Sequence, residues 1–245
     1  MKKLIYLFIL MLPINVYSQQ IRTQFNPGLA ALYHINDCVE YYPGATVKDY
    51  ISGTVGTLHG IPAWVTGKFS GALNFGGGRQ VRNWVATSYS FSMTTSCTFM
   101  AWIYRTGNQA YHIILLDSGF NWIFALSNNQ NRLCLYMGDR NPDWSQNANT
   151  TVPLNQWVFL CATWNGTTLQ YYYNGQPDGN YNCPGTNTTP AATQWIGAFA
   201  ESSGDTWCFC GIIDELAIWA NWTMSPAEIL YNYNLMTKGN SAKDQ

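Results

Sequence analysis

Hydrophobic residues alternate with a period of two along most of the chain. In the run QWVFLCATW, which begins at Gln156, apolar side chains occupy both faces of the predicted strand. A strand that is apolar on both faces is typical of the centre of a sheet. The dipeptide Asn165-Gly166 supplies two positive-φ positions for a hairpin turn into a second strand, Thr168 to Tyr173, and Asn174-Gly175 turns the chain again.

Further runs repeat this pattern and end in Gly, Asn or Asp. The clearest are CTFMAWIYR, YHIILLDSG, NWIFALSN and NRLCLYMGD, and shorter candidates are LAALYHIN, GTLHG and ALNF. Many short strands at regular spacing predict an all-β sandwich or barrel of antiparallel sheets. One short helix is expected near the C-terminus. Ser225 is its N-cap, Pro226 its first residue, Glu228 completes a capping box, and the helix should end near Asn234.

The first 18 residues have the layout of a secretory signal peptide. Two lysines precede an apolar run from Leu4 to Leu12, and Val16-Tyr17-Ser18 offers a small-residue cleavage site. We therefore expect residues 1–18 to be removed and residues 19–245 to form a single exported domain. Its location would be extracellular, or periplasmic in a bacterium. No later apolar run is long enough to span a membrane, so no membrane span is expected in the mature chain.

The composition narrows the function further. Charged residues make up 10% of the chain and aromatic residues 16%, so neutral polar groups must cover much of the surface. The net charge of −1 gives no field that would attract phosphate backbones, which argues against nucleic acid as a partner. The chain also lacks a Gly-rich phosphate loop, a His-Glu-x-x-His element and a Gly-x-Ser-x-Gly elbow.

The seven cysteines predict partial disulfide bonding in an exported protein. A bridge from Cys183 to either Cys208 or Cys210 would tie a long loop to the closing strand. The sequence leaves the connectivity open.

Five segments follow one another in a fixed order: VKDYISGTVGTLHG, GKFSGALNFGGGRQV, SCTFMAWIY, LNQWVFLCATWNGTTLQYYYNGQ and GIIDELAIWANWTMSPAEI. Together they resemble the laminin-G-like branch of the concanavalin A-like lectin/glucanase superfamily, over about residues 29–234. The resemblance implies a jelly-roll sandwich of two antiparallel sheets with one short C-terminal helix. The turn from Gly76 to Val81 departs from the family, because it has no acid where the family has an Asp-rich turn.

The resemblance also implies a structural calcium ion that joins the opening loop to the closing strand. Asp49 and Asp214 would be its carboxylate ligands, and carbonyl groups near Gly53 would add to them. Calcium prefers six to eight oxygen ligands, and two acids are few. The alternative stays open: Asp214 binds backbone N–H groups or a turn nearby. Glu215 is expected to be a solvated or hydrogen-bonded strand residue.

A catalytic role for the adjacent acids Asp214 and Glu215 is not favoured. Neighbouring strand residues point to opposite faces, so the two carboxylates cannot converge on one glycosidic bond. The Glu-x-Asp-x-x-Glu pattern of the superfamily's glucanases is absent, and the chain has only four glutamates. A pair could still be built from the remaining aspartates, which include Asp117, Asp139, Asp143, Asp178 and Asp205.

Three tryptophans are the candidate ligand-binding residues. Trp122, Trp144 and Trp207 lie in the polar, turn-rich contexts SGFNWI, NPDWSQN and GDTWCF. The face of an exposed indole attracts the electropositive C–H side of a sugar ring. The alternative is that these tryptophans cover loops and sheet edges.

The sequence thus predicts a secreted, non-catalytic binding module whose most favoured ligand is a glycan, bound in the manner of a lectin. A protein-binding or adhesion module is the first alternative, and a polysaccharide-cleaving glycosidase of the same superfamily is the second. No organic cofactor is indicated.

Overall fold

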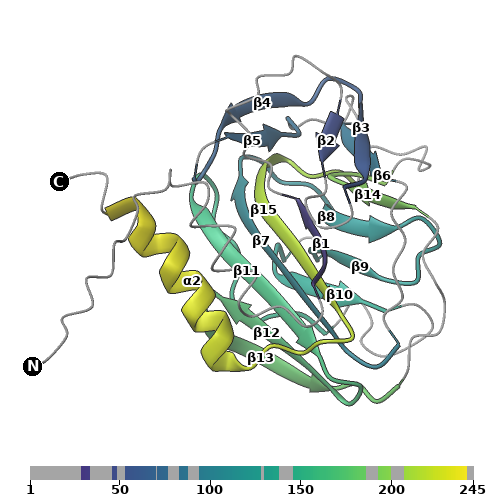
Figure 1. Ribbon diagram of the computed structural model, residues 1–245, viewed down its shortest axis with the longest axis vertical. Helices are drawn as coiled ribbons and strands as arrows, with labels where there is room; N and C mark the ends of the chain where they lie inside the picture. The colour runs from purple at the N-terminus through teal and green to yellow at the C-terminus, as the bar shows by residue number, and fades with distance from the viewer. Residues whose placement is uncertain are drawn as a thin grey trace, which may run out of the picture.

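Two antiparallel sheets pack face to face, and one helix covers the outer side of the larger sheet (Figure 1). The computed structural model describes residues 29–33, 46–48, 53–69, 71–76, 83–87, 94–127, 130–137, 146–185, 193–199 and 207–241. The predicted residues Asp49, Trp144 and residues 1–18 lie outside these ranges, as do Asp139, Asp143 and Asp205.

The larger sheet has eight strands in the order β13-β12-β11-β7-β15-β5-β4, with β1 beside β15. Their bounds are β1 (Leu29–Tyr33), β4 (Ala63–Thr66), β5 (Gly71–Asn74), β7 (Cys97–Arg105), β11 (Trp157–Trp164), β12 (Thr168–Tyr173), β13 (Gln176–Asn182) and β15 (Gly211–Ala220). We call it the eight-stranded sheet.

The second sheet has seven strands in the order β10-β9-β8-β14-β6-β3-β2. Their bounds are β2 (Thr46–Lys48), β3 (Val55–His59), β6 (Trp84–Thr87), β8 (His112–Asp117), β9 (Ile123–Leu126), β10 (Leu133–Tyr136) and β14 (Gln194–Ile196). All strand pairs in both sheets are antiparallel, so the predicted jelly-roll sandwich is confirmed.

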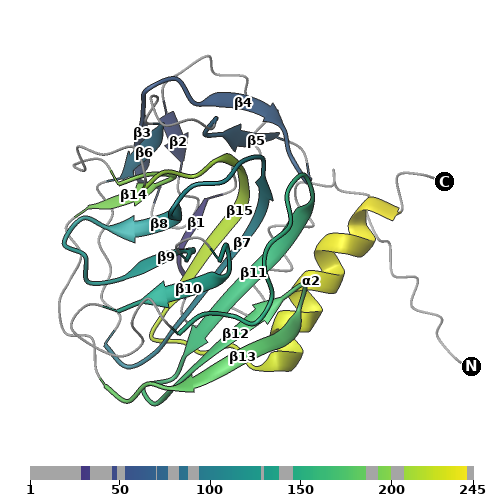
Figure 2. The ribbon, with the colours of Figure 1, turned by 180° about the vertical axis from the view of Figure 1, so that it is seen from behind.

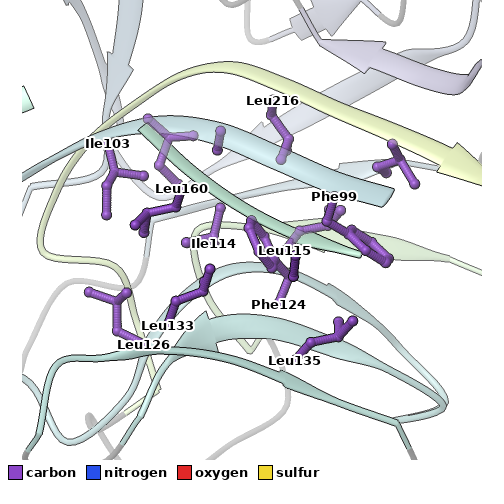
Figure 3. Packing of buried hydrophobic residues seen from close by; sticks show 14 of the residues in the cluster. Phe99, Ile103, Ile114, Leu115, Phe124, Leu126, Leu133, Leu135, Leu160 and Leu216 are labelled. Carbon is purple, nitrogen blue, oxygen red and sulfur yellow. The ribbon is translucent and has the colours of Figure 1, made fainter. Parts of the chain in front are cut away.

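The main core lies between the sheets and is made of side chains that alternate inward along each strand. Figure 3 shows Phe99, Ile103 and Leu160 of the eight-stranded sheet facing Phe124 and Leu135 of the seven-stranded sheet. All five are essentially inaccessible to solvent. Burying side chains of this size stabilises the fold by about 1.5–3 kcal/mol each, so this core is the main source of stability.

Strand β11 shows why both of its faces are apolar. It lies between β7 and β12. Val158 and Leu160 point into the main core, whereas Phe159 and Cys161 point to the outer side, into a second cluster under the helix. The prediction of a central strand is therefore confirmed.

The two hairpin turns differ from each other. Asn174 and Gly175 both have positive φ (49° and 77°) and join β12 to β13 as a two-residue turn. At Asn165-Gly166 only the glycine has positive φ (89°). The Asn165 side chain instead accepts the N–H groups of Thr167 and Thr168, so the expectation of two positive-φ residues there is wrong.

Helix α2 (Pro226–Ser241) begins as predicted. Glu228 Oε2 accepts the Ser225 N–H (2.7 Å), and the Glu228 N–H donates to Ser225 Oγ (3.3 Å), which makes a capping box. The helix runs seven residues past the predicted end at Asn234. Its inner side packs Ile229 and Tyr233 against the outer cluster of the eight-stranded sheet, and Met236, which lies beyond the predicted end, continues this packing.

Figures 1 and 2 show the helix along β11, β12 and β13, on the side away from β8, β9 and β10. Within the described residues, no helix combines the length and the hydrophobicity needed to cross a membrane.

Candidate functional site: the outer face of the seven-stranded sheet

The three predicted binding tryptophans have different surroundings. Trp122 is 1% exposed and packs in the main core, with its ring 5.1 Å from Phe99. Its polar neighbours close the β8–β9 turn while the indole points inward. The prediction that Trp122 contacts a ligand is therefore wrong. Trp207 is half-buried, and Trp144 lies outside the described residues.

Trp207 belongs to a group of rings on the outer side of the seven-stranded sheet. The centre of its ring is 4.7 Å from that of Tyr111 and 6.0 Å from that of Phe199. The Phe199 ring in turn lies 4.5 Å from the Phe120 ring and 5.6 Å from the Trp195 ring, centre to centre. We call these five residues the aromatic cluster. The Phe199 N–H donates to the Trp207 carbonyl (2.9 Å), so backbone pairing joins the segments that carry the two rings.

Strand register explains how this face is composed. Directly opposed residues of antiparallel strands share a face. Seven such residues form one row across the whole sheet: Tyr136, Ile123, Leu116, Trp195, Ala86, Thr57 and Thr46. The row changes from large apolar side chains over β10, β9 and β8 to small or polar ones over β6, β3 and β2.

Exposure follows the same gradient. Leu116 and Ile123 are fully buried and Trp195 is 8% exposed, although all three are on the outer side of the sheet. Ala86 is half-buried and Thr57 is exposed. The outer face is therefore covered over β8 and β9 and accessible from β6 onward. We call the accessible part, formed by Thr46, Thr57, His59, Trp84 and Ala86, the open strip.

Trp84 and His59 are paired across β6 and β3. Their rings stack with centres 4.6 Å apart and an interplanar angle of 5°. Both side chains are half-buried, so each keeps part of its surface in contact with solvent. Because the imidazole lies parallel to the indole, it fixes the orientation of the Trp84 ring.

Trp84 and His59 did not stand out in the sequence. Trp84 belongs to a strand of only four residues, and His59 follows a short run of small residues. The alternation in WVAT was the available signal, since it places Trp84 and Ala86 on one face and Val85 and Thr87 on the other.

The acid pair Asp214 and Glu215 lies in β15 of the eight-stranded sheet, where it has a structural role. Asp214 is fully buried. Its Oδ2 accepts the backbone N–H groups of Lys68 (2.9 Å) and Phe69 (3.3 Å), which belong to the β4–β5 turn. This is the alternative that the sequence left open, in which Asp214 binds the N–H groups of a turn. Burial, reinforced by the neighbouring Glu215 carboxylate, raises the pKa of Asp214 well above its usual value.

Glu215 occupies a β-bulge. The register of β15 against β7 shifts between Asp214 and Ala217, and Glu215 has φ of 52°. Its side chain is 3% exposed, so of the two expectations for Glu215, solvated or hydrogen-bonded, the first is wrong. A positive φ is uncommon for a residue with a side chain. The bulge changes the directions in which the side chains of Asp214 and Glu215 point.

Two other acids that were candidates for catalysis also hold loops. Asp117 is fully buried and accepts the Gly119 N–H at 2.7 Å. Asp178 accepts both the N–H (3.1 Å) and the hydroxyl (2.7 Å) of Thr150. These carboxylates are committed to the fold, and neither lies in the open strip.

The described residues do not assemble a calcium site around Asp214. Its Oδ2 is occupied by two N–H donors, and Gly53 is an exposed glycine with φ of 73°. Among the described residues, no three His, Cys, Asp or Glu side chains gather in a way that could hold a metal ion. Calcium prefers a shell of six to eight oxygens. A calcium ion with Asp49 as a ligand stays a prediction.

The predicted disulfide is not present in the structure, where Cys183, Cys208 and Cys210 are thiols. Their positions explain why. The Cys183 carbonyl accepts the Trp164 indole N–H, and Trp164 is opposite Cys97 at the start of β7. Cys210 precedes Gly211, which is opposite Arg105 at the end of β7. A nine-residue strand spans about 25 Å, whereas the Cα atoms of a disulfide lie within about 7 Å.

Comparison with known proteins identifies relatives of this fold. A laminin-G family model, described as the concanavalin A-like lectin/glucanases superfamily, matches residues 76–230, more than half of the chain. A search of curated protein sequences found no significant match.

Solved structures with the same fold include domain 4 of AbnA, an extracellular arabinanase from Geobacillus stearothermophilus, in complex with arabinotriose. It has a TM-score of 0.64 and 15% sequence identity, over 84% of this chain and 98% of that one. Botulinum neurotoxin type C, described as depending on two ganglioside molecules for cell entry, has a TM-score of 0.59 and 15% identity, over 88% of this chain and 53% of that one. The binding domain of botulinum neurotoxin DC, in complex with rat synaptotagmin II, has a TM-score of 0.58 and 14% identity, over 85% and 52%. The chain thus spans about half of each neurotoxin chain, and identities this low show the fold alone.

Proposed function

The chain belongs to the concanavalin A-like lectin/glucanases superfamily, and from that premise we propose that it is a non-catalytic module that binds glycans through the outer face of its seven-stranded sheet. The observation that carries this proposal is the concentration of partly exposed aromatic rings there, beside uncharged polar side chains. Sugar-binding surfaces combine these two features, because rings stack on C–H groups while hydroxyl and amide groups bond sugar hydroxyls.

The opposite outer face supports this choice of surface. Helix α2 covers the eight-stranded sheet through Ile229 and Tyr233, and the Tyr233 ring stacks on Trp102 at 5.8 Å. Trp102 is 2% exposed as a result. A ligand on that side would have to displace the helix, whereas the open strip needs no such rearrangement.

The ligands of the structural relatives also support a glycan. One relative is in complex with arabinotriose, and another is described as interacting with gangliosides. Both are only 15% identical to this chain in sequence, so they support the class of ligand and not its identity.

The roles of three described acids support a module without catalysis. Asp117, Asp178 and Asp214 each accept hydrogen bonds that hold a turn or loop. A hydrolase needs two carboxylates on either side of the scissile bond, about 5–10 Å apart. Turnover of any polysaccharide by the purified protein would refute this part of the proposal.

We further propose that the protein acts outside the cytoplasm after removal of residues 1–18. Mass spectrometry of the protein recovered from its producing cells would show an N-terminus at Gln19. Retention of the first 18 residues in the mature protein would refute this proposal.

Protein recognition is a second candidate function, favoured by a separate observation. Ile61 is 75% exposed just before the edge strand β4, and Trp64 within that strand is 40% exposed. One structural relative is in complex with a synaptotagmin. Substituting these two residues would weaken a protein complex and leave glycan binding unchanged.

A glycan array with the purified protein tests the proposed function. We expect binding to at least one glycan, and Trp84→Ala should weaken it about tenfold or more, as expected for loss of one stacking ring with its surrounding contacts. Trp64→Ala is the matched control, because it removes an exposed tryptophan from the other sheet. An array without binding, or equal losses in the two variants, would refute the proposal. Running the array and a thermal melt with calcium and with EDTA tests the calcium prediction in parallel.

A further inference from the structure

The open strip has a distinctive charge composition. Its side chains are two threonines, an alanine, a histidine and a tryptophan. Asp117, the acidic residue among the described strands of this sheet, is fully buried and paired with Gln194. None of the five side chains of the open strip is Arg, Lys, Asp or Glu, and Lys48 follows at a register position on the same face of the edge strand β2.

Anionic sugars require a different composition. Carboxylates and sulfates are bound by Arg or Lys, whose charge compensates for the water that the anion loses. The face of an aromatic ring carries negative potential, so it repels an anion while it attracts C–H groups. A surface of rings and hydroxyl groups therefore discriminates against uronic, sialylated and sulfated glycans.

Resting on the proposed function, we propose that the ligand is a neutral glycan and that Trp84, oriented by His59, is its stacking residue. His59 covers one side of the Trp84 ring at 4.6 Å and holds it in place before the ligand arrives. An oriented ring loses little freedom on binding, which favours affinity. The hydroxyl of Thr57, on an exposed side chain of the same strand as His59, can bond sugar hydroxyls.

A neighbouring position leaves room for the sugar. Ala86, two residues after Trp84 on the same face, has the smallest side chain in the row between Trp195 and Thr57. Gly197 adds no room, because the space where its side chain would lie is filled by the Phe75 ring of the main core, 2.2 Å from a Cβ at this position.

Lys48 provides the sharpest test of the charge argument. It pairs with Val55 on the edge strand β2, which puts it at a register position on the same face. Removing the charge at position 48 should weaken the binding of an anionic glycan and leave the binding of a neutral glycan unchanged. Lys48→Gln should therefore leave the dissociation constant within about twofold, whereas Trp84→Ala should raise it about tenfold.

The experiment compares neutral and anionic oligosaccharides of matched length by calorimetry. We expect binding to neutral oligosaccharides only, with less than about twofold change in the dissociation constant from about 50 mM to about 500 mM NaCl. Thr57→Arg, at an exposed position that tolerates a larger side chain, should block binding without unfolding the protein, and this variant keeps the test valid if Trp84→Ala does not fold.

The outcomes separate the two proposals. Preferential binding of anionic glycans that weakens in salt or in Lys48→Gln would overturn the neutral-glycan inference and leave the proposed function intact. Binding of a neutral glycan that is insensitive to both Trp84→Ala and Thr57→Arg would overturn the role of the open strip. Absence of binding to any oligosaccharide would overturn both.

Discussion

His112 is fully buried at the start of β8, where its Nδ1 accepts the Cys210 N–H at 3.2 Å. Burial, with the nearby Arg105 guanidinium as a second cause, lowers the pKa of His112 to about 3. An imidazole of the unfolded chain has a pKa of about 6.5. Between these two values the unfolded chain binds a proton that the folded protein does not, so stability falls as the pH is lowered from about 6.5 to about 3.

We therefore predict that acid destabilises the protein partly through His112. Between about pH 7 and about pH 4, the free energy of unfolding should fall by about 3 kcal/mol more in the wild type than in His112→Gln. Urea unfolding at a series of pH values measures this difference. Since both proteins share every other titrating group, equal pH slopes would show that His112 does not titrate in this way.

The tryptophans show what local sequence can and cannot predict about a single residue. Trp102, Trp164 and Trp219 fall in strand patterns, which are typical of core positions, and are 1–3% exposed. Trp122 and Trp84 each follow an Asn and precede a β-branched residue, yet Trp122 is buried and Trp84 is partly exposed. Neighbours along the chain predict a turn or a strand, but which face of a sheet is covered depends on segments that are remote in sequence.

At the level of elements, strong two-residue periodicity predicted strands well. The run CTFMAWIYR coincides with β7 and the segment Thr168 to Tyr173 coincides with β12. The strand β13, with the sequence QPDGNYN, was not predicted, because Pro, Asp, Gly and Asn are typical of turns. Its pairing with β12, which includes a register shift, holds it in the sheet as an edge strand, where Pro is tolerated.

The contact between β15 and the β4–β5 turn illustrates a second limit of prediction from sequence, which concerns contacts between remote segments. The family resemblance identified Asp214 as a residue with a role, and the sequence left calcium and backbone N–H groups as alternatives. Only the fold brings Lys68 and Phe69 to the carboxylate, across 146 and 145 residues of chain. Lys68 Nζ also lies 4.9 Å from the centre of the Trp102 ring, so the turn is held at two points.

We predict that this contact is a major local source of stability. Asp214→Ala leaves two N–H groups without an acceptor and should lower the free energy of unfolding by about 2–4 kcal/mol. Asp214→Asn keeps an oxygen acceptor and resembles the protonated acid that the raised pKa favours, so it should cost about 1 kcal/mol. Chemical denaturation measures both values.

The pH dependence that Asp214 gives the wild type, relative to Asp214→Asn, has the opposite sign to that of His112. A raised pKa in the folded state means that the contribution of Asp214 is greatest at low pH and is lost as the pH rises through that pKa. Equal stability of the Ala and Asn variants would show that the N–H acceptor is unimportant.

At the scale of the whole molecule, the two outer faces of the sandwich differ in how far they are covered. One is closed by α2, while the other is covered over β8 and β9 and accessible over β6, β3 and β2. The sandwich and its helix could be predicted from sequence, and a ligand surface rich in aromatic residues remains a prediction. The choice of face could not, because it depends on where the helix docks and on the register that places Trp84 beside His59.

The most direct test of the central claim is an NMR titration of the protein, labelled with ¹⁵N at its 11 tryptophan indoles, with the neutral oligosaccharide that binds best on the array. The account predicts that the Trp84 indole signal shifts with saturation at the calorimetric dissociation constant, while the Trp64 signal does not move. Saturable binding that shifts Trp64 and leaves Trp84 unchanged would contradict it.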